Sequence, residues 1–258
     1  MDLEAYRKRS EEFSEALSRE HYEGRAGLKE KVNFSAIYEA YSDLFTREAV
    51  ESVRRAREPA KEEEARRLAL LLEDAALSFL SNRTRRLRED AENFESAAQV
   101  ELPGGEKLPY RLSAVRLLNE PDRARRQALE DAREPVVLKK NGFLEPLHRA
   151  VHALPAELGY PSYLAMLASL RPYALEPVRD AMQDFLRATE ALYEREMGEA
   201  LETVGARLDE ARRHDAGFLF RGAGLDPLFP VENLVAAVGA SVRKMGLHLS
   251  AEGRIVLD

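Results

Sequence analysis

From Ala60 to about Ala98 the chain contains neither proline nor glycine, the two residues that most often interrupt a helix. This stretch predicts one long helix, or two nearly collinear ones, around which the rest of the fold must be arranged. In its first half, apolar residues recur at helical spacing, at Leu68, Leu71, Leu72, Ala75, Leu77, Phe79 and Leu80. Beyond Leu80 they thin out, so we expect the distal end of the helix to project from the protein or to be solvated.

Capping residues and the helical spacing of apolar residues predict further helices along most of the chain. Asp2 is expected to cap the first helix, Thr46 a helix over residues 47–57, and Ser162 a later one. Other helical stretches are predicted over about residues 37–45, 176–208 and 231–245, with a loop rich in glycine and proline over residues 217–230.

The residues from Asn119 to Arg126 are typical of a helix start, with a cap residue, a proline in the first turn and an acid beside it. The one clear β signal comes earlier in the chain. Residues from Val100 to Tyr110 alternate around a Pro-Gly-Gly turn, which predicts a short hairpin. The last residues, 253–258, are expected to begin a strand, whose backbone groups would need a partner.

Together these patterns predict a mainly α protein, a multi-helix bundle with long antiparallel helices and one short β-hairpin at about residues 99–111. No internal repeat or shift in composition marks a domain boundary. We therefore expect a single helical domain over residues 1–258. Its N-terminal helical part covers residues 1–98, and the hairpin with a second helical part covers residues 99–258.

The composition is that of a globular protein, with 45% hydrophobic and 33% charged residues. Apolar runs such as the one from Leu68 to Leu72 are far too short to cross a bilayer, and the N-terminus lacks the apolar stretch of a secretory signal. The net charge of −7 argues against nucleic acid, because binding to phosphates needs a basic excess. The absence of cysteine excludes disulfides, thiolate metal sites and cysteine nucleophiles. We expect a cytoplasmic protein with neither a membrane nor a nucleic acid as its partner.

Two histidines four residues apart, His148 and His152, have the spacing of zinc ligands on one face of a helix. The zincin motif also needs a glutamate directly after the first histidine, and this chain has Arg149 there. Glu145, one helical turn before His148, would be the third ligand of such a site. The competing interpretation, an ordinary helix with two solvated or hydrogen-bonded histidines, is the one we favour. The remaining histidines are isolated in the sequence: His21, His214 and His248.

Other motifs are missing or have a simpler interpretation. The sequence has no Gly-x-Ser-x-Gly elbow for a nucleophilic serine and no Gly-Lys-Ser/Thr for a phosphate. Salt-bridged helix faces are the favoured interpretation, and anion binding the alternative, for two arginine clusters: Arg83, Arg85, Arg86 and Arg88, and Arg123, Arg125 and Arg126. Aromatic residues at helical spacing are expected in the core. We therefore assign no catalytic, cofactor-binding or metal-binding residue.

Several short stretches, in order and at family-like spacing, resemble the N-terminal part of the oligoendopeptidase F-like zinc metallopeptidases, relatives of thimet oligopeptidase. These stretches are Tyr22-Glu-Gly-Arg-Ala-Gly-Leu-Lys29 with Ile37-Tyr38, Leu118-Asn-Glu-Pro-Asp-Arg-Ala-Arg-Arg126, Leu158-Gly-Tyr-Pro-Ser-Tyr163, Phe185-Leu-Arg-Ala-Thr-Glu190 with Tyr193, Phe220-Arg221, Phe229-Pro230, Met245-Gly-Leu-His-Leu249 and Ile255-Val-Leu-Asp258. The resemblance spans nearly the whole chain.

The family's His-Glu-x-x-His motif and its later zinc-binding glutamate match no position here. We therefore expect no cofactor in this chain and zinc in a catalytic part beyond Asp258. The resemblance implies that the chain is one helical wall of a substrate channel, with that catalytic half and a peptide substrate as partners. By itself it is expected to be inactive. The alternative is a stand-alone, non-catalytic helical binding or scaffold module derived from that family.

The fragment hypothesis also makes a physical prediction about the surface. The face that would meet the catalytic half should be apolar and uncovered, near Phe218 to Phe229 and the last strand. Because large apolar patches are unusual on monomers, we expect the chain to self-associate through this face.

Overall fold

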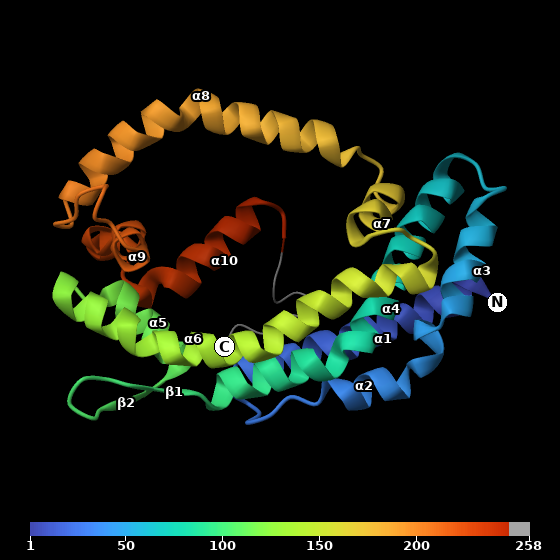
Figure 1. Ribbon diagram of the computed structural model, residues 1–258, viewed down its shortest axis with the longest axis horizontal. Coiled ribbons are helices and arrows are strands. Elements are labelled where there is room, and N and C mark those ends of the chain that lie inside the picture. The colour runs from blue at the N-terminus through green and yellow to red at the C-terminus, as the bar shows by residue number, and fades with distance from the viewer. Residues whose placement is uncertain (248–258) are drawn as a thin grey trace.

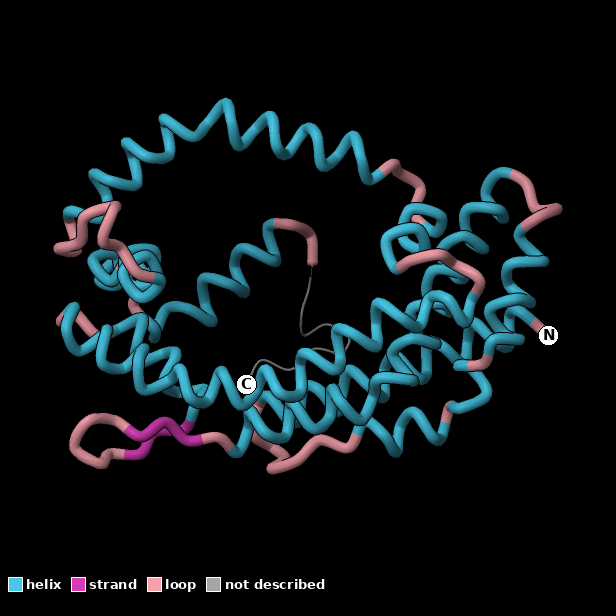
Figure 2. The backbone as a smooth tube through the Cα atoms, viewed as in Figure 1, coloured by secondary structure: helices cyan, strands magenta, loops and turns pink. Residues whose placement is uncertain are grey.

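Residues 1–247 are described by a computed structural model and fold almost entirely into α-helices (Figures 1 and 2). The prediction of a mainly α helical bundle with one β-hairpin is confirmed. The helices are α1 (Leu3–Arg25), α2 (Phe34–Ala40), α3 (Arg47–Arg57), α4 (Glu62–Ala97), α5 (Tyr110–Asn119), α6 (Arg123–Ala153), α7 (Tyr163–Leu170), α8 (Leu175–Glu202), α9 (Arg213–Arg221) and α10 (Leu234–Lys244). His248 and the strand expected over residues 253–258 lie outside the described residues.

The stretch without proline and glycine forms a single helix, α4, which packs antiparallel against α6 (Figure 1). The expectation that its distal half would be solvated is wrong. Thr84 and Ala91 in this half are only 1% and 5% exposed, because α5 and α6 cover them. Apolar residues are few there because small side chains occupy the buried positions and let the helices approach closely.

The three predicted N-caps are confirmed. The carboxylate of Asp2 accepts hydrogen bonds from the backbone N–H groups of Glu4 and Ala5, at 3.0 and 3.1 Å. The hydroxyls of Thr46 and Ser162 each accept one bond at 3.1 Å from the N–H three residues later, at the starts of α3 and α7. Each cap satisfies a backbone donor that has no partner within the first turn of its helix.

The helix start near residue 119 differs from its prediction. Asn119 is the last residue of α5, and Asp122 caps α6 by accepting a bond from the N–H of Arg125 at 2.9 Å. Pro121 therefore precedes the cap instead of standing in the first turn. The short helix α5 and the long helix α6 are thus separated at residues 120–122, a break that apolar spacing alone does not reveal.

The second half departs from the predicted boundaries in two further places. α8 ends at Glu202, earlier than the predicted residue 208. The loop predicted over residues 217–230 contains the second half of α9 and a 3-10 turn, Ala223–Leu228. The helix predicted over residues 231–245 is present as a 3-10 turn, Val231–Asn233, followed by α10.

The hairpin consists of β1 (Gln99–Glu101) and β2 (Lys107–Pro109), which pair antiparallel with Val100 opposite Leu108. Gly104 and Gly105 have φ of 101° and 85° in its turn, a region that favours glycine. Val100 is fully buried, so β1 is anchored against α5 and α6.

Three hydrophobic clusters hold the helices together. The largest joins α1 to α4 with α7, and the ring of Phe13 lies at 4.8 Å from that of Phe45 and 5.0 Å from that of Tyr38. A second cluster lies between the hairpin, α5 and α6. The third is small and consists of Met197, Leu201 and Ala206 near the junction of α8 and α9.

α8 leaves the bundle after α7 and arches over to α9, so it meets the rest of the protein at its two ends (Figure 1). α10 extends into the space below this arch in the same view and buries none of its residues. Among the helices of residues 1–247, none combines the length and the apolar composition needed to span a bilayer.

Candidate functional site

The apolar side chains of α8 are mostly exposed. Six of them expose between 48% and 65% of their surface: Val178, Met182, Phe185, Leu186, Leu192 and Tyr193. Only Met197 and Leu201 are buried, where the helix meets α9. The helix also carries eight acidic residues and three arginines, a net charge of −5. α8 is therefore an amphipathic, acidic helix whose apolar face no other described residue covers.

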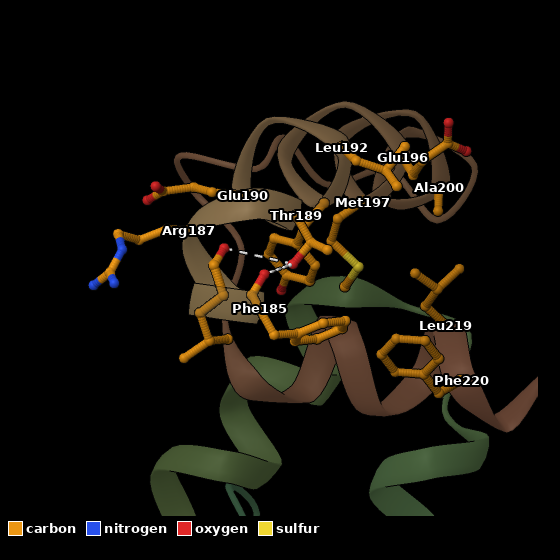
Figure 3. Close-up of a pocket in the computed structure, with 12 residues that line it drawn as sticks. Phe185, Arg187, Thr189, Glu190, Leu192, Glu196, Met197, Ala200, Leu219 and Phe220 are labelled. Carbon is orange, nitrogen blue, oxygen red and sulfur yellow. Dashed lines mark hydrogen bonds between the residues drawn. The ribbon is translucent and has the colours of Figure 1, made fainter. Parts of the chain in front are cut away.

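This face ends in a groove between α8 and α9, with a volume of about 1130 Å³ (Figure 3). We call it the α8–α9 groove. Phe185 and Met197 from α8 lie opposite Leu219 and Phe220 from α9, while Arg187 and Glu190 point away from it (Figure 3). The volume exceeds the range of about 300–1,000 Å³ that is typical of small-molecule sites. The groove is therefore large enough for a protein segment.

The α8–α9 groove offers little for chemistry. The hydroxyl of Thr189 donates to the backbone carbonyl of Phe185 at 2.8 Å, so it is already used within α8. The charged side chains at the rim are separate carboxylates and guanidinium groups with no nucleophile beside them. Such a surface suits the binding of an apolar segment, since apolar burial drives association without any polar partner.

A buried ion cluster fixes α9, and with it one wall of the groove. Asp215 of α9 is 0% exposed and accepts hydrogen bonds from Arg126 Nη2 at 3.0 Å and Arg123 Nη2 at 3.2 Å. Arg126 is itself 0% exposed, donates to the carbonyls of Glu120 and Pro121, and stacks on the ring of Phe218 at 4.3 Å. The cluster joins α9 to the start of α6.

The electrostatics of this cluster favour the charged form of Asp215. Burial alone would raise the pKa of its carboxyl group. The hydrogen bonds from Arg123, the backbone of Arg212 and Arg126 outweigh burial and lower the pKa to about 2. Beside it, His214 is 2% exposed and its Nε2 lies 3.0 Å from Oε1 of Gln127. Because Asp215 and Arg126 are closed to solvent, the role of the cluster is to position α9.

The structure does not bring His148 and His152 into a metal site. Both lie exposed near the end of α6, as does Glu145, and the ring of His152 packs against Tyr163 with centroids 5.4 Å apart. Throughout residues 1–247, no three side chains of histidine, aspartate or glutamate lie together in an arrangement that holds a metal ion.

The arginine clusters have different surroundings. In the second cluster, Arg123 and Arg126 bind the carboxylate of Asp215, so the anion they hold belongs to the same chain. In the first, Arg83 lies 3.5 Å from a carboxylate oxygen of Glu157 and Arg85 3.7 Å from one of Glu39, while Arg86 and Arg88 are exposed. The salt-bridged interpretation therefore fits Arg83, Arg85, Arg123 and Arg126.

The expectation that aromatic residues at helical spacing are core residues is wrong for Phe185 and Tyr193. They recur at helical spacing with other apolar residues of α8, as the buried Phe13 does on α1, and nothing local distinguishes a covered face from an uncovered one. The exposure expected near residues 218–229 is present at Phe220 and Phe229, each 76% exposed. Phe218 is an exception, because Arg126 stacks on it. Asp215 and His214 were not predicted, since their partners lie about ninety residues away.

Comparison with protein-family models, with curated proteins and with solved structures finds no match for this chain. The geometry of the groove and the resemblance of the short sequence stretches are the features of the chain that bear on its function.

Proposed function

We propose that the chain is the helical N-terminal portion of a zinc oligopeptidase of the oligoendopeptidase F type, and that it serves as a wall of the substrate channel. The observation that carries the proposal is the set of uncovered apolar side chains on α8, α9 and α10. Its exposed members extend well beyond the α8–α9 groove, and in the last part of the chain they are Phe220, Leu225, Leu228, Phe229, Val231, Leu234, Val235, Val238, Met245 and Leu247.

An apolar face of this extent is unusual on a protein that acts alone. The largest apolar patch on a typical monomer covers about 300–600 Å² and often has a function. Here a whole helix, α10, buries none of its residues, and α8 buries two of twenty-eight. A second protein surface, apolar at its centre and basic around it, would cover α8 and complement its charge of −5.

No catalytic step is assigned to this chain. In the proposed enzyme, zinc would polarise the peptide carbonyl and activate water, and it would be held by the partner part. The described residues do not fit a zinc site, because His148 and His152 are followed by no glutamate and lie exposed on α6. What this chain contributes is shape, an acidic surface and an apolar contact for the partner.

One observation favours the alternative of a stand-alone binding module. The α8–α9 groove is already formed within this chain, and the buried pair of Arg126 and Asp215 holds one of its walls in place. A preformed groove binds an apolar helix or peptide without the free-energy cost of ordering itself. In that case the ligand would be a separate protein.

The test compares this chain with the complete product of its gene on internally quenched peptides, with zinc and with a chelator. The proposal expects no hydrolysis by residues 1–258 alone and zinc-dependent hydrolysis by the complete product. Phe185→Asp in the complete product should lower activity or stability, because a charge would enter the covered face. Leu70→Asp is the matched control, since Leu70 is 62% exposed on α4 and away from this face.

Two results would contradict the proposal. The first is a gene product that ends at Asp258, or one that continues without His-Glu-x-x-His. The second is a complete product in which Phe185→Asp and Leu70→Asp behave alike. The first result, together with a separate protein bound in the α8–α9 groove, would support the stand-alone module.

A further inference from the structure

Four helices of the bundle, α1, α2, α4 and α6, surround a second cavity of about 240 Å³ that shares no residue with the α8–α9 groove. We call it the bundle cavity. Its apolar part includes Phe34 and Tyr38 from α2 and Leu147 from α6, all of which are buried. Cavities between the helices of a bundle are common places for ligand sites.

The wall of the bundle cavity is strongly basic. Four cationic side chains line it: Arg25, Arg85, Arg88 and Lys140. Glu92 is the one carboxylate among its lining residues; it accepts a bond from Nη2 of Arg111 at 2.6 Å and lies 3.7 Å from Nε of Arg25. Lys140 pairs with Glu95, and Arg85 lies 3.7 Å from a carboxylate oxygen of Glu39. Among residues 1–247, Arg88 is therefore the lining cation without an ion pair, and it lies next to apolar surface.

Two of the arginines retain donors with no partner. Arg88 is exposed; its Nε donates to the Thr84 hydroxyl at 3.4 Å, and within residues 1–247 its guanidinium forms no ion pair. Nε of Arg85 is buried and has no hydrogen-bond partner among the described residues. Buried donors without partners are rare in proteins and call for a specific explanation. A bound anion would supply the missing acceptor.

The charges of the arginines affect the pKa values of Tyr38 and His21, which line the same cavity. Burial raises the pKa of Tyr38, and the charges of Arg88 and Arg85 oppose that effect. Burial and the charges of Arg25 and Arg88 lower the pKa of His21, whose ring lies 4.3 Å from that of Phe34. These effects disfavour the charged form of His21, so the positive charge at the cavity belongs to the arginines and Lys140.

We propose that the bundle cavity binds a small organic anion, with a carboxylate or phosphate group at Arg88 and Arg85 and an aromatic or apolar body against Phe34. Arginine favours these anionic groups because its planar fork matches their oxygens. The volume lies below the range of about 300–1,000 Å³ for drug-sized ligands, which limits the ligand to a small molecule. This site does not depend on the proposed peptidase role.

Calorimetric titration of the chain with four probes tests the chemistry of the ligand: phenyl phosphate, benzoate, inorganic phosphate and benzyl alcohol. We expect phenyl phosphate or benzoate to bind with a Kd below about 1 mM, and the tighter of the two identifies the anionic group. Inorganic phosphate lacks the apolar body and benzyl alcohol lacks the charge, so both should bind more weakly. Absence of binding by both aromatic anions, or equal binding of benzyl alcohol, would overturn the proposal.

Two variants on the same helix test the location. Arg88→Gln should weaken the binding of the aromatic anion about tenfold, because it removes a charged hydrogen-bond donor. Arg86→Gln removes the same charge two residues away, from an exposed side chain that does not line the cavity. It should leave the Kd nearly unchanged. An equal loss in both variants would indicate attraction by net charge alone and would reject the site.

A measurement on the unmodified chain makes the test independent of the variants. Two-dimensional NMR of the histidine rings, assigned with a His21→Gln variant, should show the His21 signals moving on titration with phenyl phosphate. The signals of His148 and His152, exposed on α6, should stay in place. Movement of these two signals without that of His21 would place the anion elsewhere on the protein.

Discussion

Replacing Asp215 with asparagine is expected to lower the free energy of unfolding by about 3–5 kcal/mol, the usual loss when one partner of a buried ion pair is removed. Arg126 is 0% exposed and would keep its charge without a carboxylate beside it. The pKa provides a second route to the magnitude. Its shift from 3.8 to about 2, at about 1.36 kcal/mol per unit, corresponds to roughly 2.5 kcal/mol.

Urea denaturation followed by circular dichroism measures this loss. The matched control is Asp226→Asn, which removes a carboxylate that also accepts two bonds from one arginine, Arg221, at 2.7 and 2.8 Å. Asp226 is exposed, so this variant should unfold at nearly the wild-type urea concentration. If both variants unfold at the wild-type concentration, Arg126 is not buried against α9 and the α8–α9 groove is not held as described.

Three further results are expected. Between about pH 4 and pH 2 the wild type should lose more stability than Asp215→Asn. The ionised carboxylate of Asp215 stabilises the fold above pH 4, and this contribution is lost as the pH falls through its pKa of about 2. The same dependence of unfolding free energy on pH in both proteins would contradict this. Gly24→Ala should destabilise the protein by about 1–3 kcal/mol, because the new Cβ would lie 2.4 Å from Cγ1 of Val32. Gly142→Ala is the control: its new Cβ would meet no atom within 4 Å, so the variant should stabilise α6 by about 0.5–1 kcal/mol. In sedimentation velocity the chain alone should self-associate. Phe220→Asp should reduce that association while its free energy of unfolding stays within about 0.5 kcal/mol of wild type, and Leu70→Asp should leave the association unchanged. A monomeric wild type would count against self-association through the apolar side chains of α8, α9 and α10.

The local elements of the fold were predictable because their causes are local. Asp2, Thr46 and Ser162 bond to N–H groups two or three residues away, and a short stretch of sequence contains all the partners. The absence of proline and glycine likewise predicted one long helix or two nearly collinear ones, and α4 is a single helix. The distal half of α4 was predicted wrongly because its burial depends on α5 and α6, which follow later in the chain.

The candidate site depends on contacts that the sequence does not display. Arg126 and Asp215 are 89 residues apart, and nothing in the sequence shows that these two residues form an ion pair. Phe185 on α8 and Phe13 on α1 follow the same apolar spacing, yet Phe13 is 4% exposed and Phe185 59%. The difference lies in whether another element packs against the face, which only the three-dimensional arrangement reveals.

Hydrogen–deuterium exchange of α8 tests the central claim most directly, when this chain is compared with the complete product of its gene. An apolar face that a partner part covers should be protected there, so amides from Val178 to Tyr193 should exchange more slowly in the complete product than in residues 1–258 alone. α4, already packed in the bundle, should exchange alike in both. Equal exchange of α8 in the two proteins, or a gene product that ends at Asp258, would contradict the account.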